Sequence, residues 1–280
     1  MSPILKTLDS SYRARAIPLG SVRYWSWLFA SAEARPPLLG IFALLAEWRA
    51  LTDPAAEPSA ARMKLAWWQE EIRRLTARTP VHPIGVYLIS LPRAAEVDFS
   101  PLTIAIEASV AECSGVPLES GEELEPHAAA LRALPLAVAS RLTAAECNDG
   151  GLQKCLHALA VGDYLARSIR DYRREARFGR VLFAVDELLA AGVDNADLNA
   201  DPPPANLAGY LQQLRLRAAR SYEAAVQALP PACRSAHRHL LISAALGLRH
   251  LQHGTASLES PRLQDMLLAW STARRAQGKH

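Results

Sequence analysis

The stretch GDYLARSIRDYRREARFGR, from Gly162 to Arg180, decides the fold of this chain. The stretch is typical of a helix, and Gly179 tolerates the left-handed conformation that commonly follows a helix end. Asp171 and Glu175 are four residues apart, so both carboxylates face the same side of the predicted helix.

The charges of this helix predict a site for a metal ion and a diphosphate. Two carboxylates can bind a hard cation such as Mg2+ through their oxygen atoms, and arginines can bind a diphosphate through paired hydrogen bonds. The alternative is a solvated helix whose charges pair along its own surface. The arginines around the two carboxylates are Arg167, Arg170, Arg173, Arg174, Arg177 and Arg180.

The helix resembles the second aspartate-rich motif of the squalene/phytoene synthase family, the head-to-head trans-prenyltransferases. The segment VLFAVDELLAAGV, from Val181 to Val193, resembles the continuation of that motif. The residues in register with the family pattern are Ile169, Arg170, Asp171, Glu175, Ala176, Arg177, Gly179 and Arg180.

The resemblance extends over most of the chain and weakens beyond about Ala205. KLAWWQEEI, from Lys64 to Ile72, is similar to the family's tryptophan-pair helix, and a His-Pro pair follows at His82. LLGIFALLAEWRAL, from Leu38 to Leu51, resembles the helix before the first acidic motif. The pattern is most similar to a divergent branch of the family that includes the mitochondrial complex I assembly factor.

The resemblance implies an all-α fold, a single-domain isoprenoid synthase helical bundle around a central apolar cavity, spanning residues 1–280. The composition agrees with an all-α fold, because half of the residues are hydrophobic and only 14 are glycine. Apolar residues also recur at spacings of three and four, which is typical of helices. Helices are expected at 20–30, 37–51, 61–77, 101–113, 122–144, 151–178, 182–191, 205–228, 233–253 and 261–276.

The first acidic motif departs from the family pattern of two or three aspartates after an arginine. Here Arg49 is followed by Asp53 and Glu57, and a proline follows each of these two carboxylates. Proline disfavours helix at the residue before it, so Asp53 and Glu57 are not expected on one regular helical turn. The alternative is that Asp53 ends one helix and Glu57 begins the next, where the helix dipole favours a carboxylate.

The second motif also departs from the family pattern. Tyr164 and Arg167 replace a glutamine and an asparagine, and Glu175 replaces an aspartate. Arg167 lies four residues before Asp171, so it can pair with Asp171 and compete with Mg2+ for that carboxylate. The alternative is that its charge replaces part of the charge of the metal ion.

Two further features predict how the helices pack. Glu47 stands among apolar residues in FALLAEW, so its carboxylate needs a partner or a metal ion. Trp67 and Trp68 are adjacent and therefore point about 100° apart on a helix. We expect one of them in the core and the other in the cavity wall or in a groove between helices.

Charge and hydropathy exclude other classes of protein. The net charge is only +3, from 31 basic and 28 acidic residues, which argues against nucleic-acid binding. No apolar run is long enough to span a bilayer, and the four cysteines lack the spacing of a zinc site. We expect a cytoplasmic protein, with YWSWLF at Tyr24–Phe29 either packed in the core or touching the inner membrane peripherally.

The resemblance implies Mg2+-dependent head-to-head condensation of two prenyl diphosphates, farnesyl diphosphate or similar. The alternative is a non-catalytic member of the same fold that acts as a lipid-binding or assembly factor. The expected metal ligands are Asp53, Glu57, Asp171 and Glu175, of which Asp53, Asp171 and Glu175 are also the expected catalytic residues. The expected substrate contacts are Arg49, Tyr164, Arg167, Arg170, Arg177 and Arg180.

Overall fold

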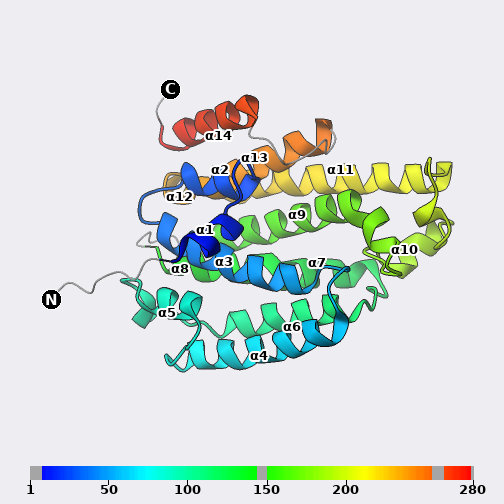
Figure 1. Ribbon diagram of the computed structural model, residues 1–280. Helices are drawn as coiled ribbons and strands as arrows, with labels where there is room; N and C mark the ends of the chain where they lie inside the picture. Colours follow the sequence, from blue (N-terminus) through cyan, green and yellow to red (C-terminus); the bar gives the residue numbers. More distant parts are fainter. Residues whose placement is uncertain (1–7, 144–149, 254–261, 279–280) are drawn as a thin grey trace.

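The computed structural model describes residues 8–143, 150–253 and 262–278, and these residues form helices with no strand among them (Figure 1). The all-α prediction is therefore confirmed. The α-helices of the first half are α1 (Ser10–Ala16), α2 (Val22–Leu28), α3 (Arg35–Leu51), α4 (Pro58–Thr76), α5 (Pro83–Ile89), α6 (Pro101–Ser114), α7 (Leu124–Ala128) and α8 (Leu134–Arg141). Those of the second half are α9 (Gly150–Ala176), α10 (Val185–Ala190), α11 (Ala205–Ala228), α12 (Pro231–Arg234), α13 (Arg238–His253) and α14 (Leu263–Ala276).

The expected helices agree with these bounds to within a few residues, except in two segments. The segment expected at 233–253 is divided into α12 and α13. The segment expected at 122–144 is divided into α7, a π-helical turn at Ala129–Ala133 and α8. Pro135 has no N–H to donate to the carbonyl four residues earlier, and the wider turn lies just before it. Residues 144 and 261, the expected ends of two helices, lie outside the described residues. Helices α1 and α5 were not expected.

Helix α9 runs through the middle of the bundle (Figure 1). It packs against α11 and α13 on one side and against α7 and the π-helical turn on the other. Helices α4 and α6 form an outer layer beyond α3, and α14 covers α13 at the opposite edge. This arrangement exposes one face of α9 to α3 and α6, the helices that carry its charged partners.

The end of α9 lies earlier than the sequence suggests. The helix ends at Ala176 and Gly179 follows with a φ of 74°, the left-handed conformation predicted for it. The N–H of Arg180 donates to the carbonyl of Glu175 at 3.0 Å, so the glycine turn closes the last helical carbonyls. Because the chain reverses here, Arg180 is turned back toward α9.

The two adjacent tryptophans of α4 have different environments. Trp68 is 5% exposed, and its ring lies edge-on to Trp48 of α3 at 6.3 Å between ring centroids. Trp67 is 43% exposed and lies edge-on to His82 at 5.8 Å. The prediction of one core tryptophan is confirmed for Trp68. Trp67 lies on the surface and not in the wall of the cavity described below.

The aromatic segment at Tyr24–Phe29 packs against α13 and α14 through Trp25, while Tyr24, Trp27 and Phe29 remain partly exposed. Trp25 is buried in a cluster with Ile242 and Leu246 of α13 and Ala269 of α14, so α2 is held against both helices. Among the described residues, no helix combines the length and the apolar character needed to cross a membrane.

Candidate functional site

A cavity of about 730 Å3 lies where α2, α3, α6, α9, α11 and α13 meet. One part of its wall is apolar, with Leu45, Trp48, Leu131, Ile169 and Leu251. The rest is strongly charged: seven arginines against three carboxylates leave a formal charge of +4, with His250 counted as neutral. The charged residues are Arg23, Arg49, Arg132, Arg167, Arg170, Arg174, Arg215, Glu112, Asp163 and Asp171.

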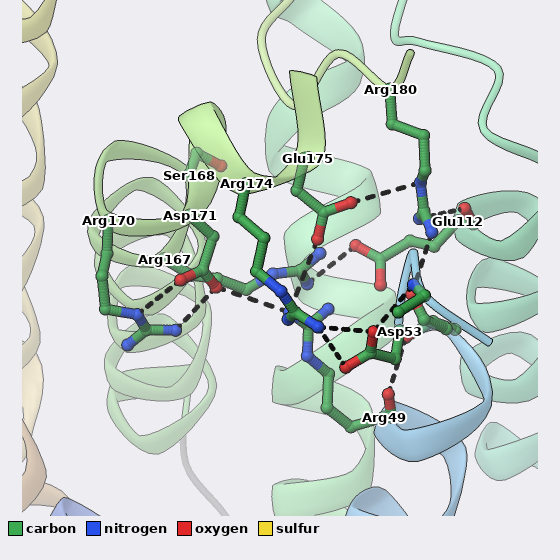
Figure 2. A network of polar contacts seen from close by, with 12 residues as sticks. Arg49, Asp53, Glu112, Arg167, Ser168, Arg170, Asp171, Arg174, Glu175 and Arg180 are labelled. Carbon is green, nitrogen blue, oxygen red and sulfur yellow. Dashed lines mark hydrogen bonds and ion pairs between the residues drawn. The ribbon is translucent and has the colours of Figure 1, made fainter. Parts of the chain in front are cut away.

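Asp171 faces this cavity with both carboxylate oxygens engaged (Figure 2). Nε and Nη2 of Arg170 each donate to one oxygen at 2.8 Å, and Nη2 of Arg49 approaches at 3.4 Å. Burial acts to raise the pKa of Asp171, but the hydrogen bonds and charge of Arg170 together with Arg49 outweigh it and lower the pKa. Asp171 is therefore an ionised carboxylate enclosed by two guanidinium groups.

Glu175 is fully buried behind the cavity wall and does not line the cavity. Its carboxylate forms ion pairs with Nε of Arg180 at 3.2 Å and with Nη2 of Arg49 at 3.8 Å. Arg180 also donates to the carbonyls of Thr52 at 3.0 Å and Glu112 at 2.6 Å. Burial raises the pKa of Glu175 despite these charges. Arg180 thus joins α9 to α3 and α6 from behind the cavity.

The first acidic motif is divided between two roles. Asp53 accepts two hydrogen bonds from Nη2 of Arg174, at 2.6 and 2.8 Å, and so belongs to the same polar network (Figure 2). The hydrogen bond from Arg174 is the main reason that the pKa of Asp53 is lowered. Glu57 instead caps the N-terminus of α4, accepting from the N–H groups of Ser59 and Ala60.

Arg167 does not pair with Asp171, which corrects the pairing expected from their spacing. Its Nη1 lies 2.8 Å from Oε1 of Glu112 on α6. The helical spacing of four residues made Asp171 reachable, but Arg170 and Arg49 already take both of its oxygens.

Tyr164, Arg177 and Glu47 lie in three different environments. Tyr164 lines the cavity, and its hydroxyl donates to the carbonyl of Leu182 at 3.3 Å. Arg177 is exposed and lies outside the cavity wall. Glu47 forms an ion pair with Arg15 of α1 at 2.8 Å, so its partner is an arginine.

A second polar group lies in the cavity wall around Asp163 of α9. Its carboxylate accepts from the hydroxyl of Tyr222 at 2.9 Å and pairs with Nε of Arg132 at 2.5 Å. The buried Tyr222 ring lies against Gly162 and Gly247, and a Cβ on either glycine would overlap the ring. The two glycines therefore allow α9, α11 and α13 to close around this tyrosine.

Arg23 of α2 and Arg215 of α11 are the cavity arginines for which the described residues show no hydrogen bond or ion pair, and Arg23 is the less exposed of the two. Burial and the charges of Arg132 and Arg49 lower the pKa of Arg23 to about 10, although the carboxylate of Asp163 acts in the opposite direction. Arg23 remains charged at neutral pH.

The residues predicted to bind Mg2+ do not fit that ion in this arrangement. Of the four, only Asp171 faces the cavity, and both of its oxygens accept from Arg170. Asp53 is bound by Arg174, Glu175 is buried, and Glu57 caps a helix. Magnesium needs several free oxygen ligands in near-octahedral geometry. The described part of the chain contains no group of three or more acidic, histidine or cysteine side chains placed to hold a metal ion.

Known structures define the class of this fold. A dehydrosqualene synthase in complex with a ligand superposes with a TM-score of 0.76 at 12% sequence identity, covering 96% of each chain. Squalene synthase HpnC from Alicyclobacillus acidocaldarius gives a TM-score of 0.69 at 18% identity, covering 88% of this chain and 94% of that chain. The protein therefore has the all-α isoprenoid synthase fold.

The model of the squalene/phytoene synthase family matches residues 20–260, and the chain belongs to this family. No curated protein matches its sequence significantly.

Sequence reasoning missed several residues of this cavity. Arg23 and Glu112 are single charges within apolar or aromatic segments, SVRYW and SVAEC. A charge among apolar residues needs a partner, and this rule identifies both. Arg132 in AALRALP and Asp163 in LAVGDYLA satisfy the same rule, since each is the only charge of its segment.

Proposed function

We propose that the cavity binds a prenyl diphosphate or a related phosphorylated isoprenoid lipid. The observation that carries this proposal is the composition of the cavity wall: apolar side chains and an excess of arginines line the same cavity. Guanidinium groups bind phosphate oxygens in pairs, and burial of a prenyl chain against apolar side chains is favourable in proportion to its area. Membership of the family supports the same class of ligand.

Calorimetric titration with a non-hydrolysable farnesyl diphosphate analogue tests the proposal. Farnesol and inorganic pyrophosphate serve as controls that carry only one half of the ligand. We expect the analogue to bind at least about tenfold more tightly than either half, because both parts of the wall contribute to its affinity. The titration is carried out once in EDTA and once in Mg2+. If the analogue binds in neither buffer, the proposal is wrong.

Head-to-head condensation of two prenyl diphosphates is a second candidate function. The observation in its favour is that Asp53, Asp171 and Glu175 gather around Arg49 and Arg174, with Asp171 facing the cavity and the other two carboxylates outside its wall. The test is release of pyrophosphate from farnesyl diphosphate by the purified protein, with and without Mg2+. Binding of the analogue without any release of pyrophosphate would favour a lipid-binding or assembly role.

We also propose peripheral contact with an anionic membrane through α14. Its exposed face carries Leu263, Leu267 and Trp270 at helical spacing, and the guanidinium of Arg274 lies 5.0 Å from the Trp270 ring centroid. An apolar stripe beside arginines is the pattern of a helix that lies at a lipid surface. Flotation with vesicles containing phosphatidylglycerol tests it. Equal recovery of wild type and Trp270→Gln with the vesicles would contradict the proposal.

A further inference from the structure

We infer that this cavity holds its anion through arginine side chains alone, with Arg23 as the anchor, and that binding needs no Mg2+. The inference rests on the proposed function, because it takes the anion to be the diphosphate of a prenyl lipid. It differs from that function in assigning the positive charge of the site to the protein and in naming a residue outside both acidic motifs.

The carboxylates of the cavity wall do not balance its arginines. Arg132 pairs with Asp163, Arg167 pairs with Glu112, and Arg49 pairs with the carboxylates of α9. Arg23 and Arg215 have no such partner among the described residues, and Arg23 is half-buried whereas Arg215 is exposed. A charge that is partly withdrawn from water is unfavourable unless an opposite charge lies beside it. An anion beside Arg23 would supply the missing opposite charge.

Hydrogen-bond donors without an acceptor lie on the same wall. Nη1 of Arg49 and Nε and Nη2 of Arg167 are buried and have no acceptor within the described residues. Most buried donors in proteins find an acceptor, so several free ones in one place indicate a group that binds there. Both arginines line the cavity together with Arg23. Small rotations of their guanidinium groups would direct these donors at a phosphate oxygen.

The carboxylates that a metal ion would need are already bound by arginines. The oxygens of Asp171 and Asp53 already accept hydrogen bonds from Arg170 and Arg174. For Mg2+ to bind Asp171, its hydrogen bonds to Arg170 would first have to break. The lining has a formal charge of +4 without any metal. The arginines can therefore neutralise a diphosphate by themselves.

The experiment is calorimetric titration of the farnesyl diphosphate analogue into three proteins, once in EDTA and once in excess Mg2+. The proteins are wild type, Arg23→Gln and the control Arg62→Gln, which removes an exposed arginine of α4 outside the cavity. We expect wild type and Arg62→Gln to bind in EDTA as tightly as in Mg2+. Arg23→Gln should weaken binding about 10- to 100-fold, the effect of losing a charged hydrogen-bond donor.

Thermal unfolding of the free proteins separates a binding role from a structural one. Removal of an unpaired charge should leave the unfolding temperature of Arg23→Gln unchanged or higher, whereas loss of a structural arginine would lower it. Arg23→Met, which keeps the length of the side chain, replaces it if the glutamine variant does not fold.

The outcomes distinguish the proposed binding of a prenyl diphosphate from the inference that Arg23 anchors it without Mg2+. Binding that appears only with Mg2+ overturns the inference and leaves the proposed function intact. Equal affinity of Arg23→Gln and wild type overturns the assignment of Arg23 as anchor. Absence of binding in both buffers overturns the proposed function and the inference together.

Discussion

Nη1 of Arg167 lies 2.8 Å from Oε1 of Glu112, and this ion pair joins α9 to α6 at the cavity wall. The two side chains are only 16% and 7% exposed, and Nε2 of His127 approaches the same oxygen at 3.7 Å. Burial acts to raise the pKa of Glu112, but Arg167, His127 and Arg49 outweigh it and lower the pKa to about 2. The pair is therefore ionised at neutral pH and fixes the position of Arg167.

Replacing Glu112 with glutamine should destabilise the protein by about 3 kcal/mol at pH 7, because it leaves the buried Arg167 guanidinium unpaired. The pKa of Glu112 falls from 4.5 in the unfolded chain to about 2 in the folded protein. Its contribution is therefore fully present above pH 4.5 and is lost as the pH falls toward 2. Urea unfolding of both proteins between pH 7 and 3 measures the difference, which should shrink below pH 4.5.

Glu107→Gln is the matched control, since Glu107 is exposed on the same helix. It should change the free energy of unfolding by less than about 0.5 kcal/mol at every pH. A Glu112→Gln difference that stays constant down to pH 3 would contradict the assignment of the pair.

Arg170 should determine whether Asp171 can respond to a metal ion. Arg170→Gln removes the two hydrogen bonds that occupy both oxygens of Asp171. We expect Mg2+ to strengthen binding of the farnesyl diphosphate analogue about tenfold in this variant, because one oxygen edge becomes free. Wild type should show no such effect in the same titration. Asp171→Asn in the Arg170→Gln background should abolish the gain, and a variant indifferent to Mg2+ would refute this role for Arg170.

The two tryptophans of α4 should differ sharply in their effect on stability. Trp68→Ala should cost about 3–5 kcal/mol, because it opens a cavity beside Trp48 in the core. Trp67→Ala should cost less than about 1 kcal/mol, since its ring is largely at the surface. The free energies of unfolding in urea provide the measurement. Equal costs for the two variants would show that the packing of α4 differs from this description.

His239 of α13 should make the protein sensitive to mild acid. The side chain is 3% exposed, and burial, followed by His237 and Arg238, lowers its pKa from 6.5 to about 3. The unfolded chain binds a proton below pH 6.5 that the folded protein does not bind, so stability is full above 6.5 and falls as the pH drops toward 3.

The loss due to His239 should reach up to about 1.4 kcal/mol per pH unit. His239→Leu should flatten the curve of unfolding free energy between pH 6.5 and 5. A curve parallel to that of wild type would indicate that His239 is protonated in the folded state.

The helices of this protein could be predicted from the sequence because their signals are local. The glycine turn at Gly179 and the positions of α3, α6 and α11 follow from spacing, prolines and turn residues. Glu57 also behaves as a local rule suggests, because a carboxylate before a helical proline is well placed to cap the helix.

The partners of the charged residues could not be predicted in the same way. Spacing placed Asp171 within reach of Arg167, but spacing gives no information on α6, where Glu112 competes for the same arginine. Likewise, Arg170 is adjacent to Asp171 in the sequence, and adjacent residues on a helix do not usually face each other. Its long side chain curls back to the carboxylate. The balance between these alternatives depends on tertiary packing.

The Tyr222 ring between Gly162 and Gly247 has a consequence for the size of the ligand. The ring occupies space that is free only because both neighbours lack a side chain, and it forms part of the cavity wall. A single methyl group at either glycine would push the ring aside, and the room left for a hydrocarbon tail would change with it. The missing side chains of the two glycines therefore set the length of the hydrocarbon tail that the cavity accepts. Exchange of glycine for alanine at either position would change that length.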